Sequence, residues 1–108
     1  NLRGRLKSDA SGRFWFETVL PSFYPIPDDG PVGELLRKMG RHPWRPGHLH
    51  FWLQAPGHRQ VITHLFVRGD KYLDSDVVFG VKDSLITDFG AAQERGKLSY
   101  DFRLKKAA

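Results

Sequence analysis

A nine-residue stretch, RPGHLHFWL at Arg45–Leu53, decides the fold of this chain. Histidines alternate there with apolar residues, which predicts a β-strand because successive side chains of a strand point to opposite faces. His48, His50 and Trp52 would share one face, opposite three apolar side chains. Imidazoles two residues apart on a strand are about 7 Å apart at Cα, which lets both reach one metal ion. The alternative is a pair of half-buried histidines that only form hydrogen bonds inside a β-protein.

The segments around this stretch predict a mostly β chain, arranged as an antiparallel β-sandwich with one short helix. Aromatic and β-branched residues with turn signals between them indicate the further strands. Turns are expected at 9–12 and 55–57, where Gly, Pro, Ser and Asp gather. The expected strands are 12–20, 60–67 and 98–104, with 2–7 as a hairpin arm before the first turn.

One helix is expected over 30–40. Val32, Leu35, Leu36 and Met39 recur there at near-helical spacing between two glycines. The segment 69–76 is expected to be a polar loop. Its three aspartates lack the glycine and terminal glutamate of a calcium-binding EF-hand loop, so solvated side chains are the better interpretation. These aspartates are Asp70, Asp74 and Asp76.

The composition fits one globular domain spanning 1–108. Hydrophobic residues make up 40% of the chain, enough for a sandwich core. The net charge of +5 comes from basic residues spread along the chain without a nucleic-acid-binding motif, so we expect no nucleic-acid partner. No apolar run reaches membrane length, and we expect no membrane partner. The absence of cysteine fits a reducing cytoplasm, where we expect the protein to act.

Tyr24 is a candidate ligand for a hard metal ion. It lies in a proline-rich loop at 20–31, and each proline fixes its own φ and restricts the residue before it. A tyrosinate is a hard anionic oxygen donor that suits Fe(III), which imidazole suits as well. The lack of cysteine argues against zinc-finger and iron–sulfur sites.

Four motifs carry a family resemblance: YPIPDDGPVG at 24–33, GRHPWRPGHLH at 40–50, APGHR at 55–59 and GDKYLDSDVVFGVK at 69–82. In this order and spacing they resemble the intradiol ring-cleaving dioxygenases, which are non-haem Fe(III) enzymes. The resemblance covers nearly the whole chain. Within the family, the FGVKDSL run at 79–85 and the NLRGR start look most like the hydroxyquinol 1,2-dioxygenases.

The resemblance implies the cofactor and the reaction. Fe(III) would be bound by Tyr24, His48 and His50, with a further tyrosine expected upstream of Asn1. The chain would form part of the catalytic β-sandwich domain, without the family's N-terminal helical region. The parent enzyme, expected to be a homodimer, would insert both atoms of O2 into a small aromatic diol or triol. Hydroxyquinol (benzene-1,2,4-triol) would give 3-hydroxy-cis,cis-muconate, the tautomer of maleylacetate.

The resemblance also implies roles for single side chains. Tyr24 would accept a proton from the substrate, and Arg45 would stabilise negative charge on the ring. His64 lies where catechol-cleaving relatives usually carry glutamine, and it would orient the bound reactants. The catalytic residues would thus be Arg45, Tyr24 and His64. The residues that contact the substrate would be Ile26, Pro27, Arg45 and Val78.

Three alternatives stay open. The substrate is catechol or a chlorocatechol; or the chain is a non-catalytic β-sandwich module; or a zinc ion is bound by His48, His50 and His64, with one position left for water. For Arg45, the alternative to an active-site role is a surface ion pair.

Overall fold

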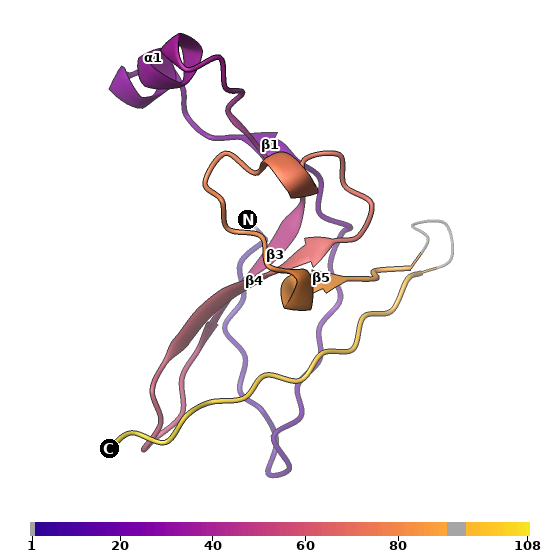
Figure 1. Cartoon of the computed structure of the whole chain (residues 1–108). Helices are drawn as coiled ribbons and strands as arrows, with labels where there is room; N and C mark the ends of the chain where they lie inside the picture. The colour runs from indigo at the N-terminus through magenta and orange to yellow at the C-terminus, as the bar shows by residue number, and fades with distance from the viewer. Residues whose placement is uncertain (1, 91–94) are drawn as a thin grey trace.

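The computed structural model describes residues 2–90 and 95–108. A β-hairpin forms its centre (Figure 1), in which β3 (His48–Leu53) runs antiparallel to β4 (Val61–Val67). His50 lies opposite His64, and His48 lies opposite Phe66. The strand expected from the histidine stretch is confirmed, as is the strand expected at 60–67 and the turn at 55–57.

A third strand was not expected from the sequence. β5 (Ile86–Thr87) pairs with the end of β4 in the parallel direction, so the sheet order is β3-β4-β5. Parallel pairing needs a long connection between the two strands, and residues 68–85 provide it. The expected antiparallel pairing holds for β3 with β4, and this edge of the sheet is a parallel exception to it.

A short ribbon stands beside the sheet and places Tyr24 next to Arg45. β1 (Tyr24–Pro25) pairs antiparallel with β2 (Trp44–Arg45), and Tyr24 lies opposite Arg45. The helix α1 (Pro31–Lys38) connects the two strands and projects away from the sheet (Figure 1). This confirms the expected helix, which begins with proline at a position where no N–H donor is needed. Among the described residues, no helix is long and apolar enough to cross a membrane.

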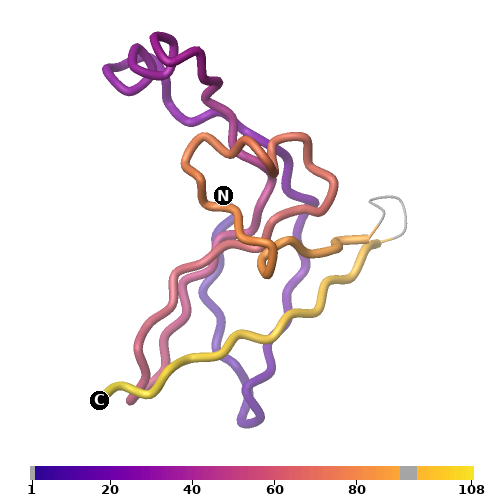
Figure 2. Tube along the Cα trace, in the orientation of Figure 1, coloured from indigo at the N-terminus to yellow at the C-terminus, as the bar shows by residue number. Residues whose placement is uncertain are grey.

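The mostly β, one-helix class is confirmed, but three expected strands are wrong as hydrogen-bonded strands. The segments 2–7, 12–20 and 98–104 are extended without a ladder, and the C-terminal segment contributes only the isolated bridge His58–Lys106 among the described residues. Figure 2 traces the course of these segments around the hairpin. Two of them, 12–20 and 98–104, touch it through aromatic rings, as Phe16 and Phe102 do against Phe51. The radius of gyration is 16.3 Å, against about 13 Å for a compact domain of this size. The second layer of the sandwich is therefore not closed.

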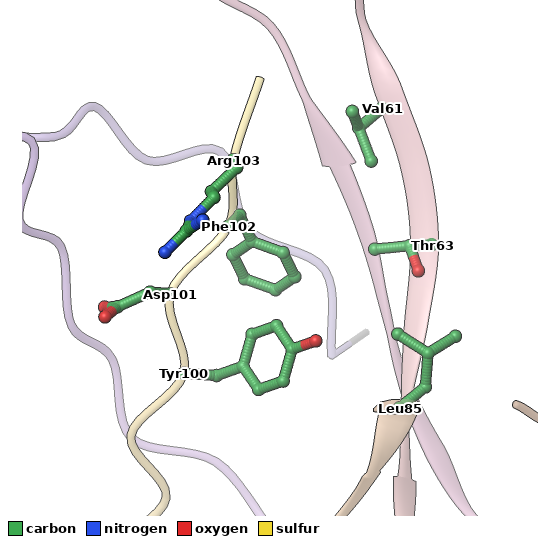
Figure 3. A pocket seen from close by; sticks show the side chains of 7 residues that line it. All are labelled: Val61, Thr63, Leu85, Tyr100, Asp101, Phe102 and Arg103. Carbon is green, nitrogen blue, oxygen red and sulfur yellow. The ribbon is translucent and has the colours of Figure 1, made fainter. Parts of the chain in front are cut away.

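The two faces of β4 have different surroundings. Phe66 is fully buried beside the histidines, and Leu65 is 1% exposed on the other face. On that other face, Val61 and Thr63 line a cavity of about 310 Å³ opposite Tyr100 and Phe102 (Figure 3). Because side chains alternate along a strand, this cavity lies on the side of the sheet away from His64.

The segment 69–80 is a loop, as expected for 69–76, but it forms a scaffold, and the expectation of a solvated side chain was wrong for Asp76. It contains the 3-10 turn η1 (Leu73–Ser75), and a second turn, η2 (Asp83–Leu85), leads into β5. The Gly47 N–H donates to Asp70 Oδ2 at 2.9 Å, and the Val77 N–H donates to the Trp44 carbonyl at 3.2 Å. Asp74 is exposed as expected, whereas Asp76 is only 3% exposed. The segment thus supports the backbone that leads into His48.

Gly47 allows the loop before Tyr24 to lie against the start of β3. A Cβ at this position would be 2.7 Å from the carbonyl oxygen of Pro21 and 3.1 Å from the carbonyl carbon of Ser22. Both obstacles are backbone atoms, which cannot rotate aside. The absence of a side chain at Gly47 therefore sets the distance between the tyrosine loop and the histidine strand.

We expect Gly47→Ala to move the 21–24 segment away from His48 and to destabilise the chain by about 1–3 kcal/mol, as overpacking does. NOE contacts between the Tyr24 and His48 rings, together with urea unfolding, measure both effects. Gly30→Ala is the matched control, because no atom lies within 4 Å of its Cβ position. Equal Tyr24–His48 contacts in the wild type and Gly47→Ala would contradict this account.

We expect Phe66→Ala to lower the free energy of unfolding by about 3–5 kcal/mol, because it empties a fully buried site. The ring lies against both His48 and His64, so their NMR signals should shift as well. Ile62→Ala on the same face of β4, where the side chain is 55% exposed, should cost much less. Urea denaturation of the two variants makes the comparison; equal losses would show that Phe66 is not part of the core.

Candidate metal and substrate site

Three imidazoles lie together on one face of the β3–β4 hairpin. The ring of His64 is 4.8 Å from that of His48 and 4.6 Å from that of His50, measured between centroids. His48 and His50 share a face because they are two residues apart on β3, as predicted, and His64 joins them because it is the register partner of His50. His50 is exposed, so the cluster opens to solvent.

The hydrogen bond of His48 fixes which ring nitrogen is free. Its Nδ1 lies 2.7 Å from the carbonyl oxygen of Pro46, which can only accept, so Nδ1–H is the donor. The lone pair is therefore on Nε2, at the outer end of the ring. A metal-binding histidine is commonly oriented in this way, by a bond from its other nitrogen to a backbone carbonyl.

The surroundings favour neutral imidazoles. Burial lowers the pKa of His48, and the nearby Arg45 cation acts in the same direction against the opposing effect of the Pro46 carbonyl. Burial, followed by the charges of His48 and His50, lowers the pKa of His64 to about 4. Near pH 7 both rings are uncharged, which is the protonation state that metal binding requires.

Tyr24 reaches the histidines from the ribbon. Its ring centroid lies 5.5 Å from that of His48, and its side chain is 42% exposed. The antiparallel pairing of β1 with β2 holds its backbone opposite Arg45. Tyr24, His48 and His50 thus come from two separate elements and gather at one side of the hairpin.

The site offers two kinds of donor, imidazole nitrogens and the phenol of Tyr24. Within residues 2–90 and 95–108, no three His, Asp or Glu side chains are arranged so that they could hold a metal ion. The zinc alternative needs His48, His50 and His64 around one ion, and the structure does not support it. The iron interpretation uses only two of the imidazoles and adds the phenol of Tyr24, a hard oxygen donor that Fe(III) prefers.

Arg45 forms a buried ion pair, so the alternative of a surface ion pair does not apply. Its Nε donates to Asp76 Oδ1 at 3.0 Å and its Nη2 to Oδ2 at 3.3 Å. Arg45 is 8% exposed and Asp76 3%. Burial alone lowers the pKa of Arg45, but Asp76 and the Tyr24 oxygen outweigh it, so the pKa lies above its ordinary value. The guanidinium is a permanent cation beside Tyr24.

Asp76 is the site residue that the sequence analysis missed. Burial alone would raise its pKa, but hydrogen bonds from Arg45 and from the N–H groups of Gly80 and Val78 outweigh this and lower it. A signal was available: an arginine in an apolar motif needs a counter-charge, because an unpaired buried charge is costly. Asp76 lies in the motif 69–82, on which the resemblance partly depends.

The predicted substrate-binding residues surround the ribbon and the turn after Asp76. Ile26 is half-buried, and its N–H extends the ribbon by donating to the Pro43 carbonyl at 2.9 Å. Pro27 is exposed, and Val78 is 48% exposed. Exposed apolar groups near a charged site are suited to contact a small ring, and their role as its walls stays a prediction.

Known proteins share both the sequence and the fold of this chain. The sequence model of a family described as "Dioxygenase" matches residues 1–106. The 6-chlorohydroxyquinol 1,2-dioxygenase of Cupriavidus pinatubonensis is 62% identical over 104 residues, covering 94% of this chain and 37% of that protein. A crystal structure of hydroxyquinol 1,2-dioxygenase from Pseudomonas putida DLL-E4 superimposes with a TM-score of 0.78 at 51% identity, covering 98% of this chain and 38% of that one.

A more distant structure shares the architecture equally well. The 3-chlorocatechol 1,2-dioxygenase of Rhodococcus opacus 1CP gives a TM-score of 0.82 at 35% identity, covering 93% of this chain and 41% of that one. This chain therefore spans only about two fifths of the length of these relatives. The match of the family model to nearly the whole chain, together with these likenesses, establishes that the chain belongs to the dioxygenase family, among its intradiol ring-cleaving members.

Proposed function

We propose that this chain carries the iron and substrate site of a non-haem Fe(III) intradiol dioxygenase that cleaves hydroxyquinol, benzene-1,2,4-triol. The observation that carries the proposal is the meeting of three features on one side of the hairpin. Tyr24 lies against His48, His50 belongs to the same imidazole cluster, and a buried arginine flanks the tyrosine. A module that only kept the fold would not need this combination.

Tyr24, His48 and His50 would hold Fe(III), together with a donor from outside this chain. When bound, the ion would act as a Lewis acid that lowers the pKa of the substrate hydroxyls. His48 would bind through Nε2, the nitrogen that its bond to the Pro46 carbonyl leaves free. Because His48 is neutral near pH 7, no proton needs to leave this ring on binding.

Tyr24 would serve as the proton acceptor. A catechol-type substrate that binds through both oxygens loses two protons, and the phenolic oxygen of Tyr24 would accept one of them. The partial exposure of Tyr24 leaves its ring room to move as substrate arrives. Arg45, whose backbone is paired with that of Tyr24, would place its cation next to the negative charge that develops on the ring.

His64 would orient the bound reactants. It lies across the hairpin from His50, and its ring is within 5 Å of both neighbouring imidazoles by centroid distance. Its low pKa keeps it neutral, so it would act as a hydrogen-bonding group and not as a cation. Ile26, Pro27 and Val78 would supply the apolar walls that a small aromatic ring requires.

Hydroxyquinol is favoured over catechol and chlorocatechol because the hydroxyquinol-type relatives share more of the sequence than the chlorocatechol enzyme does. O2 would be the second substrate, and 3-hydroxy-cis,cis-muconate the product. We further propose that the parent enzyme is a cytoplasmic homodimer without nucleic-acid or membrane partners, as the family resemblance and the composition suggest.

The test is a visible spectrum of the Fe(III)-loaded chain. We expect a tyrosinate-to-iron charge-transfer band that shifts when benzene-1,2,4-triol is added without oxygen. Tyr24→Phe should lose this band, because it removes the phenolate donor. Tyr100→Phe is the control, since the Tyr100 hydroxyl donates to the Ser84 carbonyl and lies on the other side of the sheet. A colourless wild type that ignores the triol would instead favour the non-catalytic module.

We expect His64→Leu to lower turnover about 100-fold, because one positioned hydrogen-bonding group at a reaction centre contributes roughly that much. His64→Gln keeps a neutral polar group and should retain most of the turnover. Oxygen uptake with the triol as substrate measures both. If His64→Gln and His64→Leu are equally impaired, the imidazole acts in some way other than neutral hydrogen bonding.

A further inference from the structure

We propose that Asp76 is the positioning residue of the site: it holds the Arg45 guanidinium in the orientation that ring cleavage needs. The inference deepens the proposed function and rests on it. Nothing in the motif spacing assigned a role to this carboxylate, which lies 31 residues from its partner along the chain.

Each oxygen of Asp76 accepts one hydrogen bond from the guanidinium and one from the backbone. Oδ1 accepts from Arg45 Nε at 3.0 Å and from the Val78 N–H at 3.3 Å. Oδ2 accepts from Arg45 Nη2 at 3.3 Å and from the Gly80 N–H at 2.9 Å. The two backbone bonds prevent the carboxylate from rotating, so the carboxylate in turn prevents rotation of the guanidinium.

The turn at 76–80, which supplies these N–H groups, has an unusual backbone conformation. The Phe79 N–H donates to the Asp76 carbonyl at 3.0 Å, and Phe79 adopts a positive φ of 55° although it is not glycine. Such a backbone conformation persists only where the surroundings determine it. The Phe79 ring is 79% exposed and covers the Arg41 guanidinium at 4.3 Å, so core burial does not explain the conformation. We attribute the positive φ of Phe79 to the hydrogen bonds that the turn makes with Asp76.

The absence of a side chain at Gly80 leaves room for the ion pair. A Cβ there would be 3.1 Å from Arg45 Nη2 and 3.2 Å from Asp76 Oδ2. The glycine therefore lets its own N–H approach the carboxylate without displacing the arginine. Because Nε and Nη2 of Arg45 bond to Asp76, Nη1 takes no part in the ion pair.

A fixed orientation decides whether Arg45 stabilises the charge that develops in the reaction or the starting state before it. A fixed guanidinium acts on charge that develops in the reaction, and it costs no reorganisation at that moment. A guanidinium free to rotate would also pair with the substrate hydroxyls, and it would then stabilise the starting state. Asp76 thus acts on turnover through Arg45, without contact with the reacting atoms.

The first test compares Asp76→Asn and Asp76→Glu with the matched control Asp74→Asn, an exposed aspartate two residues away. We expect Asp76→Asn to lower kcat about 100-fold, as a misplacement of about 1 Å can do, with KM and the iron charge-transfer band little changed. Asp76→Glu should recover part of kcat, and Asp74→Asn should match the wild type. Parallel loss of kcat, substrate affinity and iron binding in Asp76→Asn would overturn the proposal, because it would indicate general loosening.

A double-mutant cycle tests whether Asp76 acts through Arg45. In the background of Arg45→Gln, we expect Asp76→Asn to change kcat less than threefold, because the group it positions is gone. Independent losses that multiply would overturn the proposal. Gly80→Ala supplies a second perturbation that keeps both charges. It should lower kcat while the tyrosinate band is kept; full activity in Gly80→Ala would show that the position of Arg45 Nη2 is not critical.

The last readout needs no metal. In the metal-free chain, we expect the Arg45 Nε–H to give a slowly exchanging NMR signal that disappears in Asp76→Asn and stays in Asp74→Asn. If the loaded wild type shows no tyrosinate band, the proposed function fails, while this signal still decides whether Asp76 holds the guanidinium. An Arg45 Nε–H that exchanges equally fast in the wild type and in Asp76→Asn would overturn the positioning role by itself.

Discussion

The structure depends on the ion pair between Arg45 and Asp76. Two buried charges are costly unless each is paired and its remaining hydrogen-bonding capacity is used, and removal of one partner from such a pair typically costs about 3–5 kcal/mol. Here four donors meet the two carboxylate oxygens. The pair joins the ribbon that carries Tyr24 to the scaffold at 69–80, and the scaffold supports the backbone before His48. The pair fixes the charge of Arg45, while separate bonds, such as that from the Gly47 N–H to Asp70, hold the backbone of the ligand strand.

Local sequence patterns predicted the parts of the molecule that local physics determines. The alternation in RPGHLHFWL gave the strand and the common face of His48 and His50, because side-chain direction follows directly from strand geometry. The spacing of apolar residues between glycines gave the helix α1. The family resemblance added Tyr24, whose ring the structure places against His48. None of these inferences required knowledge of distant contacts.

The features that the sequence did not reveal all depend on non-local pairing. The segments 12–20 and 98–104 have the composition of strands, but a strand needs a backbone partner, and composition does not say whether one is within reach. The two residues of β5 are too few to show any period. Asp76 has the local sequence of a solvated loop, and only its distant partner Arg45 makes it a buried residue.

The connection of residues 68–85 also orders the assembly of the site in time. The imidazoles of His50 and His64 come from a hairpin with a short loop, and closing a short loop is fast. Arg45 and its carboxylate are 31 residues apart, so their contact closes a much longer loop. We therefore expect the histidine face to form before the arginine is fixed, so that a folding chain gathers the imidazoles before it can direct charge.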